Sequence, residues 1–128
     1  MSDKVIELRK TRHSLIESGI IKLQVNAGEF IDVDDVVKMH DANLQLSKGK
    51  PFGVLLDTSM GYFNTTTEAR NLIASKEYAL VMKASAFVVK NLATKLAGNF
   101  FINLNKPNAP TRLFNSEEEA LDWLRQFA

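Results

Sequence analysis

The stretch Phe52-Gly-Val-Leu-Leu-Asp-Thr-Ser-Met-Gly-Tyr-Phe-Asn-Thr-Thr-Thr-Glu-Ala-Arg70 decides the fold. Its first part, Phe52–Leu56, is a short apolar run without alternation, which predicts a strand covered on both faces. The run ends at Asp57, and small, polar and turn-forming residues follow. Thr65 and Glu68 then have the spacing of a capping box, which predicts the start of a helix. A buried strand that leads through a loop into a helix is typical of the edge of an α/β sheet that meets ligands or partners.

The composition of the chain narrows its class. A length of 128 residues predicts a single domain, residues 1–128. The chain has no cysteine, which excludes disulfides and thiolate chemistry. A net charge of +1 does not favour nucleic acid as a partner. Apolar runs fall far short of the ~20 residues of a transmembrane helix, and the N-terminus has no signal-peptide pattern. We therefore expect a cytoplasmic protein.

The N-terminal region predicts antiparallel strands. Lys4–Arg9 reads as an edge strand, and Ser14–Glu17 and Ile20–Val25 flank a two-residue turn signal and form a hairpin. The basic character of this region indicates either contact with an anionic surface or charged protection of a sheet edge, and we favour edge protection. The residues that give it this character are Lys4, Arg9, Lys10, Arg12 and His13.

Strands and helices alternate along the rest of the chain. The expected elements are a helix from Asp32 to about Ser47, strand Phe52–Leu56, helix Thr66–Ala74, strand Ala84–Val89, a helix over Leu92–Leu104, strand Thr111–Phe114 and a helix capped by Ser116 with Glu119. Such alternation implies parallel strands with right-handed crossovers. The predicted fold class is α/β: an N-terminal β-hairpin followed by alternating β/α units, with a mainly parallel sheet of four to five strands and about four helices.

The sequence contains no motif for catalysis. It has neither a nucleophile elbow nor a glycine-rich phosphate loop, so we predict a non-enzymatic protein without catalytic residues or a cofactor. The histidines, His13 and His40, lack a partner at metal-ligand spacing, so we predict no metal site and interpret His40 as a core histidine. Asp57 and Lys90, at the ends of neighbouring strands, are expected to form a structural ion pair.

The loop and helix start after the central strand form the candidate binding edge. Capping needs one of three consecutive threonines, assigned to Thr65, and we favour capping alone as their role. The alternative is that the remaining hydroxyls bind an anion or accept a phosphate, with Thr66 as the candidate acceptor. The bulky apolar residues in the loop indicate a surface that meets a partner protein or a second copy of the chain. The predicted binding residues are Asp57, Thr58, Met60, Tyr62, Phe63, Thr65, Thr66, Thr67, Lys90 and Asn91.

Five segments carry a resemblance to a known family: Glu68-Ala69-Arg70, Lys83–Val89, Gly98–Pro107, Pro110–Phe114 and Glu118–Leu124. From about Phe52 to Leu124 the chain resembles small bacterial proteins of the STAS/SEC14-like group, which share the fold of the anti-sigma-factor antagonists. The resemblance implies a STAS-like core that binds partners or small apolar ligands without catalysis. In the antagonists a serine at the corresponding helix start is phosphorylated, where this chain has threonines.

Two functional hypotheses follow. In the first, the protein is a regulatory module that presents the edge Thr58–Arg70 to a protein partner. In the second, it carries a small apolar or lipid-like molecule in a cleft between the apolar loop side chains and the helix that contains Phe100 and Phe101. Both phenylalanines are expected in the core, because they fall on the apolar stripe of that helix.

Overall fold

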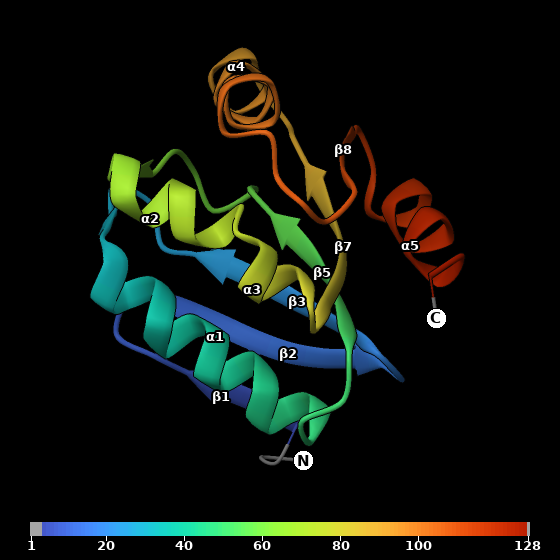
Figure 1. Ribbon diagram of the computed structural model, residues 1–128. Coiled ribbons are helices and arrows are strands. Elements are labelled where there is room, and N and C mark those ends of the chain that lie inside the picture. The colour runs from blue at the N-terminus through green and yellow to red at the C-terminus, as the bar shows by residue number, and fades with distance from the viewer. Residues whose placement is uncertain (1–3, 128) are drawn as a thin grey trace.

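The computed structural model describes residues 4–127 and is built around a six-stranded sheet of order β1-β2-β3-β5-β7-β8 (Figure 1). Strands β1, β2 and β3 pair antiparallel, whereas β3, β5, β7 and β8 pair parallel. The predicted α/β class, with its hairpin and mainly alternating units, is confirmed. The sheet has more strands than the expected four to five, because β1 and β8 both join it. The strands are β1 (Val5–Glu7), β2 (Thr11–Glu17), β3 (Ile20–Val25), β5 (Phe52–Asp57), β7 (Met82–Val88) and β8 (Thr111–Phe114), with a separate short parallel pair of β4 (Phe30–Ile31) and β6 (Asn64–Thr65).

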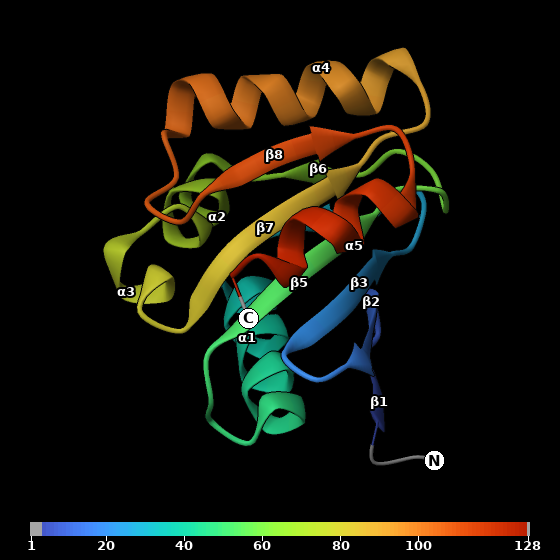
Figure 2. The ribbon, with the colours of Figure 1, turned by 90° about the vertical axis from the view of Figure 1, so that its right-hand side faces the viewer.

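Helices cover both faces of the sheet. α1, α2 and α3 lie over one face, α5 covers the other, and α4 lies beside β8 (Figures 1 and 2). Side chains of the preceding residues cap α1, α4 and α5, because Asp, Asn and Ser accept hydrogen bonds from the unpaired N–H groups of a first turn. The helices are α1 (Val33–Ser47), α2 (Thr67–Ile73), α3 (Lys76–Ala79), α4 (Leu92–Phe100) and α5 (Glu117–Arg125), with a π-helical turn, Phe101–Asn105, after α4.

Alternation along the strands divides the apolar side chains between two cores. On β5, Val54 packs towards α1 and α2, whereas the next residue, Leu55, packs towards α5. A Cβ atom at Gly53 would lie 3.2 Å from Leu124 Cδ2, so glycine at this position lets α5 approach the sheet closely. The expected adjacent parallel strands, β5 and β7, are confirmed, and both contribute buried side chains to each of the two cores.

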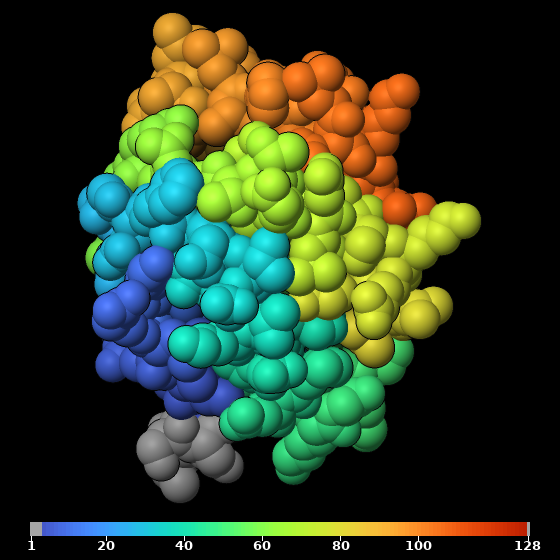
Figure 3. Space-filling model, turned by 60° about the vertical axis from the view of Figure 1, so that its left-hand side comes forward, coloured from blue at the N-terminus to red at the C-terminus, as the bar shows by residue number. Residues whose placement is uncertain are grey.

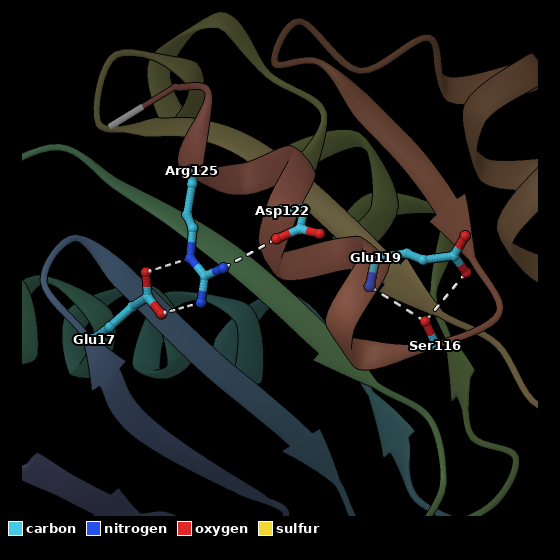
Figure 4. Close-up of polar contacts among 5 residues, drawn as sticks. All are labelled: Glu17, Ser116, Glu119, Asp122 and Arg125. Carbon is cyan, nitrogen blue, oxygen red and sulfur yellow. Dashed lines mark hydrogen bonds and ion pairs between the residues drawn. The ribbon is translucent and has the colours of Figure 1, made fainter.

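Helix α5 is also fixed to the hairpin by polar contacts. Arg125 forms a two-pronged contact with Glu17, through Nη2 to Oε1 at 2.9 Å and Nε to Oε2 at 3.0 Å (Figure 4). This hydrogen bonding lowers the pKa of the Glu17 carboxyl. At the other end of the helix, the Glu119 backbone N–H donates to Ser116 Oγ at 3.2 Å, and the Ser116 hydroxyl donates to the Glu119 carboxylate (Figure 4). The predicted pairing of Ser116 with Glu119 is therefore confirmed.

Two sequence-based placements are wrong. His13, grouped with the basic edge residues, is fully buried, since alternation along β2 turns it towards α1. Phe101 is 7% exposed and belongs to the core as expected, but Phe100 is 49% exposed. Adjacent helical residues point about 100° apart, so the sheet covers only one of these two rings.

Candidate ligand-binding site

An open cavity of about 650 Å³ lies between the sheet, α1, α2 and α4. This volume is within the ~300–1,000 Å³ typical of small-molecule sites. Its floor is the set of side chains that β3, β5 and β7 turn towards α1 and α2, and apolar groups dominate its surface. The floor side chains include Leu23, Val25, Val54, Leu56, Ser85 and Phe87.

Helix α4 forms one wall of the cavity. Ala93, Leu96, Ala97 and Phe100 line the cavity, and Leu96 is 58% exposed because no side chain of the sheet or of α2 covers it fully. At the inner end of this wall the helix is tight against β8: a Cβ atom at Gly98, which also lines the cavity, would lie 3.0 Å from Leu113 Cδ2. In Figure 3, α4 and the turn after it (orange) lie above α2 (yellow-green) on the surface. The helix is thus anchored along one side while the other faces open space.

Arg70 brings a positive charge to this apolar cavity. Its Nη1 donates to the backbone oxygen of Thr65 at 2.7 Å and to Thr65 Oγ1 at 2.9 Å, and its Nη2 donates to Thr67 Oγ1 at 3.1 Å. Its Cζ lies 5.6 Å from the centroid of the Phe100 ring, a cation–π distance that connects α2 with α4. Arg70 is thereby held at the boundary between the loop, α2 and α4.

An aromatic pair forms the opposite wall. The rings of His40 and Tyr78 are stacked, with centroids 3.8 Å apart. Burial lowers the pKa of His40 and raises the pKa of Tyr78, so both side chains are neutral near pH 7. His40 was expected in the core; it is half-buried and lines the cavity instead. The wall is therefore uncharged and suited to an apolar molecule.

The loop after β5 closes the cavity and also reaches solvent. Thr58 is buried, and its hydroxyl donates to the backbone oxygen of Val88 at 2.7 Å. Tyr62 and Phe63 line the cavity, whereas Met60 does not and is 50% exposed. The loop is ordered by backbone hydrogen bonds, including one of 2.8 Å from the Gly28 N–H to the Tyr62 oxygen. Of the apolar residues predicted to bind, two therefore face the cavity and one faces outwards.

The three threonines have roles different from those predicted. Thr66, and not Thr65, is the N-cap of α2: its hydroxyl accepts from the Ala69 backbone N–H at 3.0 Å. Thr65 lies in β6 and accepts from Arg70, as does Thr67. The N-cap residue is one position later in the chain than the predicted capping box has it. Thr65 still pairs with Ile31 in the β4–β6 pair, so the helix begins only after it.

Asp57, Lys90 and Asn91 lie outside the cavity. Asp57 Oδ2 lies 3.6 Å from Lys22 Nζ, so the expected ion pair with Lys90 is wrong. Burial raises the pKa of Asp57, but hydrogen bonds from Ser59 together with Lys22 outweigh it and hold this pKa below its usual range. Lys90 donates to a backbone oxygen, and Asn91 caps α4. The contacts of these three side chains are thus with other parts of the fold and not with the cavity. Asp57 faces α5, whereas its neighbour Thr58 faces the cavity.

The family of the chain is shown by its sequence. A model described as a domain of unknown function, DUF7793, matches residues 14–128. The chain belongs to the DUF7793 family. No curated protein matches the DUF7793 chain in sequence.

Solved structures with the same fold share little sequence with the DUF7793 chain. One is an uncharacterized protein of the DUF3478 family with a SpoIIAA-like fold, from Shewanella loihica PV-4, with a TM-score of 0.58 and 13% identity over 94% of this chain and 89% of that one. The unphosphorylated anti-sigma factor antagonist SpoIIAA has a TM-score of 0.54 and 11% identity, covering 90% and 97%. The Bacillus cell fate determinant SpoIIAA in its phosphorylated form has a TM-score of 0.50 and 13% identity, covering 90% and 99%. The fold is SpoIIAA-like, as the resemblance to STAS proteins predicted.

Two further properties concern the described part of the DUF7793 chain. None of its helices combines the length and apolar character needed to cross a membrane. Within residues 4–127, no three histidine or acidic side chains are grouped closely enough to hold a metal ion.

Sequence reasoning missed the polar and aromatic residues of the cavity wall. Arg70 lies within the predicted edge but is not among the predicted binding residues, and the sequence gives no functional signal for Tyr78, which lies on the short helix α3. A lone arginine after three threonines is a weak signal, because its partners depend on how the loop folds. His40 gave a signal through its position on an apolar stripe, but only the packing of α1 against α3 shows that it faces a cavity.

Proposed function

We propose that this protein is a non-enzymatic regulatory module of the STAS type that binds a small apolar molecule and contacts a protein partner through the segment Thr58–Arg70. One observation carries the proposal: the predicted partner-binding edge is also a wall of the cavity. A ligand inside the cavity touches the segment that a partner meets outside it, so binding of one affects binding of the other. The residues of this segment that line the cavity are Thr58, Tyr62, Phe63, Asn64, Thr65 and Arg70.

The polar groups of the cavity support binding without catalysis. Nucleophilic catalysis by a hydroxyl needs an adjacent base within hydrogen-bonding distance. Among the described residues, the cavity histidine, His40, forms no side-chain hydrogen bond to a serine or threonine; it stacks on Tyr78 instead. The absence of cysteine fits a reducing compartment, so the proposal places the protein in the cytoplasm. The near-neutral net charge of +1 gives no reason to propose nucleic acid as a partner.

A second candidate function is transport of the same kind of molecule without a protein partner. The cavity of about 650 Å³ favours it, because that volume accommodates a drug-sized or lipid-like ligand. The two candidates share the ligand and differ in whether the outer surface of the loop is used. Tests of the cavity and of the loop surface therefore need different variants.

Nile red, a neutral apolar dye, tests the cavity. We expect saturable binding to one site, weakened by about tenfold or more in Ala97→Phe, which places a ring in the cavity. Asn99→Phe is the matched control, because Asn99 is exposed on the same helix and does not line the cavity. Equal binding by Ala97→Phe and the wild type would place the dye elsewhere. As an independent test, native mass spectrometry of protein purified from its own host should show a copurified small molecule if the cavity binds one.

Sedimentation velocity tests the loop surface, with a second copy of the chain as the partner. We expect Met60→Ser to weaken self-association at equal thermal stability, since Met60 is half exposed and contributes nothing to the cavity wall. Leu80→Ser is the control, because Leu80 is 78% exposed on another part of the surface. A protein that stays monomeric at every concentration would exclude a second copy and favour the carrier.

A further inference from the structure

Arg70 is the only side chain with a formal charge among the described residues that line the cavity. Lysine, aspartate and glutamate do not occur in that lining. In addition, no described carboxylate lies within ion-pair distance of Arg70, whereas Arg125 is paired with Glu17 and Lys22 with Glu117. A charged side chain that serves only to stabilise a fold is usually paired with an opposite charge where it is shielded from water. The Arg70 guanidinium has no such carboxylate partner among the described residues.

The hydrogen bonds of Arg70 leave one side of the guanidinium unused. A guanidinium has five N–H donors in a planar fork. Three are occupied, two by Thr65 and one by Thr67. The remaining donors are Nε–H and one N–H of Nη2. Among the described residues, Arg70 Nε is the buried side-chain nitrogen or oxygen atom without a hydrogen-bond partner. Buried polar groups are almost always paired, so an unpaired donor of a charged group indicates a missing acceptor.

We propose that the ligand of this cavity is an amphipathic oxyanion, with an apolar body in the cavity and a carboxylate or phosphate on Arg70. The inference rests on the proposed function, because it assigns the chemical class of the molecule that the cavity binds. Nε–H and Nη2–H are the pair of donors that a carboxylate or phosphate accepts in a two-pronged contact. Thr65 and Thr67 hold the other side of the fork and so orient this pair.

Phe100 controls access to this site. Its ring covers the guanidinium, with Arg70 Cζ 5.6 Å from the ring centroid, and Nε is closed to water in this arrangement. The ring is 49% exposed and lines the cavity, so it can change rotamer without leaving a packed core. An anionic group reaches Nε when the ring moves away. The ring then covers the ion pair from solvent.

The test compares ligands that share an apolar chain and differ in the head group. Dodecanoate, dodecyl phosphate, methyl dodecanoate and dodecanol are titrated below their micelle-forming concentrations, by displacement of Nile red. We expect the wild type to bind one or both anions about tenfold or more tightly than the ester and the alcohol. The stronger of the two anions identifies the head group as carboxylate or phosphate.

Variants of Arg70 locate the preference. Arg70→Gln should lose the preference for the anion over dodecanol, measured as the ratio of the two affinities, whereas Arg70→Lys should keep part of it. Arg112→Gln is the matched control: Arg112 also stacks on a phenylalanine, with Cζ 5.1 Å from the Phe114 ring, but lies outside the cavity. The comparison of ligands on the wild type needs no variant, so it remains decisive if Arg70→Gln does not fold.

The outcomes separate this inference from the proposed function. Equal affinity of the wild type for dodecanol and for both anions would overturn the role of Arg70 and leave an apolar ligand in place. An anion preference that survives in Arg70→Gln would also overturn it. Failure of all four molecules and of Nile red to bind would overturn the proposed function, and the inference with it.

Discussion

His13 Nδ1 on β2 lies 2.8 Å from Asn43 Oδ1 on α1, and both side chains are buried. Because an amide oxygen only accepts hydrogen bonds, Nδ1 carries the proton and Nε2 accepts from Thr11 Oγ1, 2.9 Å away. The three side chains form a closed polar contact inside the apolar layer between the helix and the sheet. Their hydrogen bonds fix the position of α1 on the hairpin.

Replacing Asn43 with alanine should destabilise the protein by about 1–3 kcal/mol, because the buried N–H of His13 loses its acceptor. The free energy of unfolding in urea measures the change. Asn99→Ala is the control, since Asn99 is exposed on α4 and the substitution changes only helix propensity. Equal stability of the two variants would show that the contact between Asn43 and His13 contributes nothing.

The stability of the protein should fall as the pH decreases through 6.5, the ordinary pKa of histidine. Burial lowers the pKa of His13 and that of His40 in the folded state, and Asn43 only partly offsets this for His13. Below the unfolded pKa the unfolded chain therefore binds more protons than the folded one, so the free energy of unfolding decreases. Above that pH the stabilisation is fully present.

Urea midpoints between about pH 5 and pH 8 measure this dependence, a range in which carboxylates stay charged. His40→Gln should retain the larger part of the slope, because His13 is more deeply buried. His13→Gln should lose that part. A midpoint that does not vary over this range would contradict the assigned pKa directions.

Two neighbouring phenylalanines should differ strongly in their contribution to stability. Phe101→Ala should cost about 3–5 kcal/mol, since Phe101 is 7% exposed and packs near the Phe87 ring at a centroid distance of 5.9 Å. Phe100→Ala should cost much less, because that ring is half exposed at the cavity. Each variant is the other's control in thermal or urea unfolding. Equal losses would mean that α4 is rotated from the position described.

Thr66→Ala should cost about 0.5–2 kcal/mol through loss of the N-cap of α2, and Thr66→Asp should restore most of it. An acidic group is also favourable at this helix start, so a phosphate on Thr66 is expected to leave α2 folded. Thermal unfolding of both variants checks the prediction. Thr65→Ala is the control, because Thr65 contacts Arg70 but does not cap α2. If Thr65→Ala lost stability and Thr66→Ala did not, the cap would be Thr65, as the sequence predicted, and not Thr66.

Local sequence alone determined the fold class and the order of the main strands and helices, but not the short pair of β4 and β6 or the short helix α3. Phe52–Leu56 is too apolar for a surface strand, the turn at 18–19 joins two complementary strands, and Asp32 and Ser116 supply caps that act within one helical turn. These features depend on interactions between residues close in the chain, and their periodicity is readable without knowing where the rest of the chain lies.

Tertiary structure decided which side chains of each element are buried, line the cavity or form ion pairs. The apolar stripe over residues 92–104 predicted a buried face, but only Phe101 packs near Phe87 of β7, whereas Phe100 lies half exposed at an open cavity. The partner of Asp57 is Lys22 and not Lys90, since Lys22 on β3 turns its amine towards Asp57, whereas Lys90 follows β7 and donates to the backbone oxygen of Asn115. Arg70 gains its role only when β6, α2 and α4 meet around it. Charge pairing and cavity walls depend on distances between segments far apart in sequence, and a local pattern contains no information on those distances.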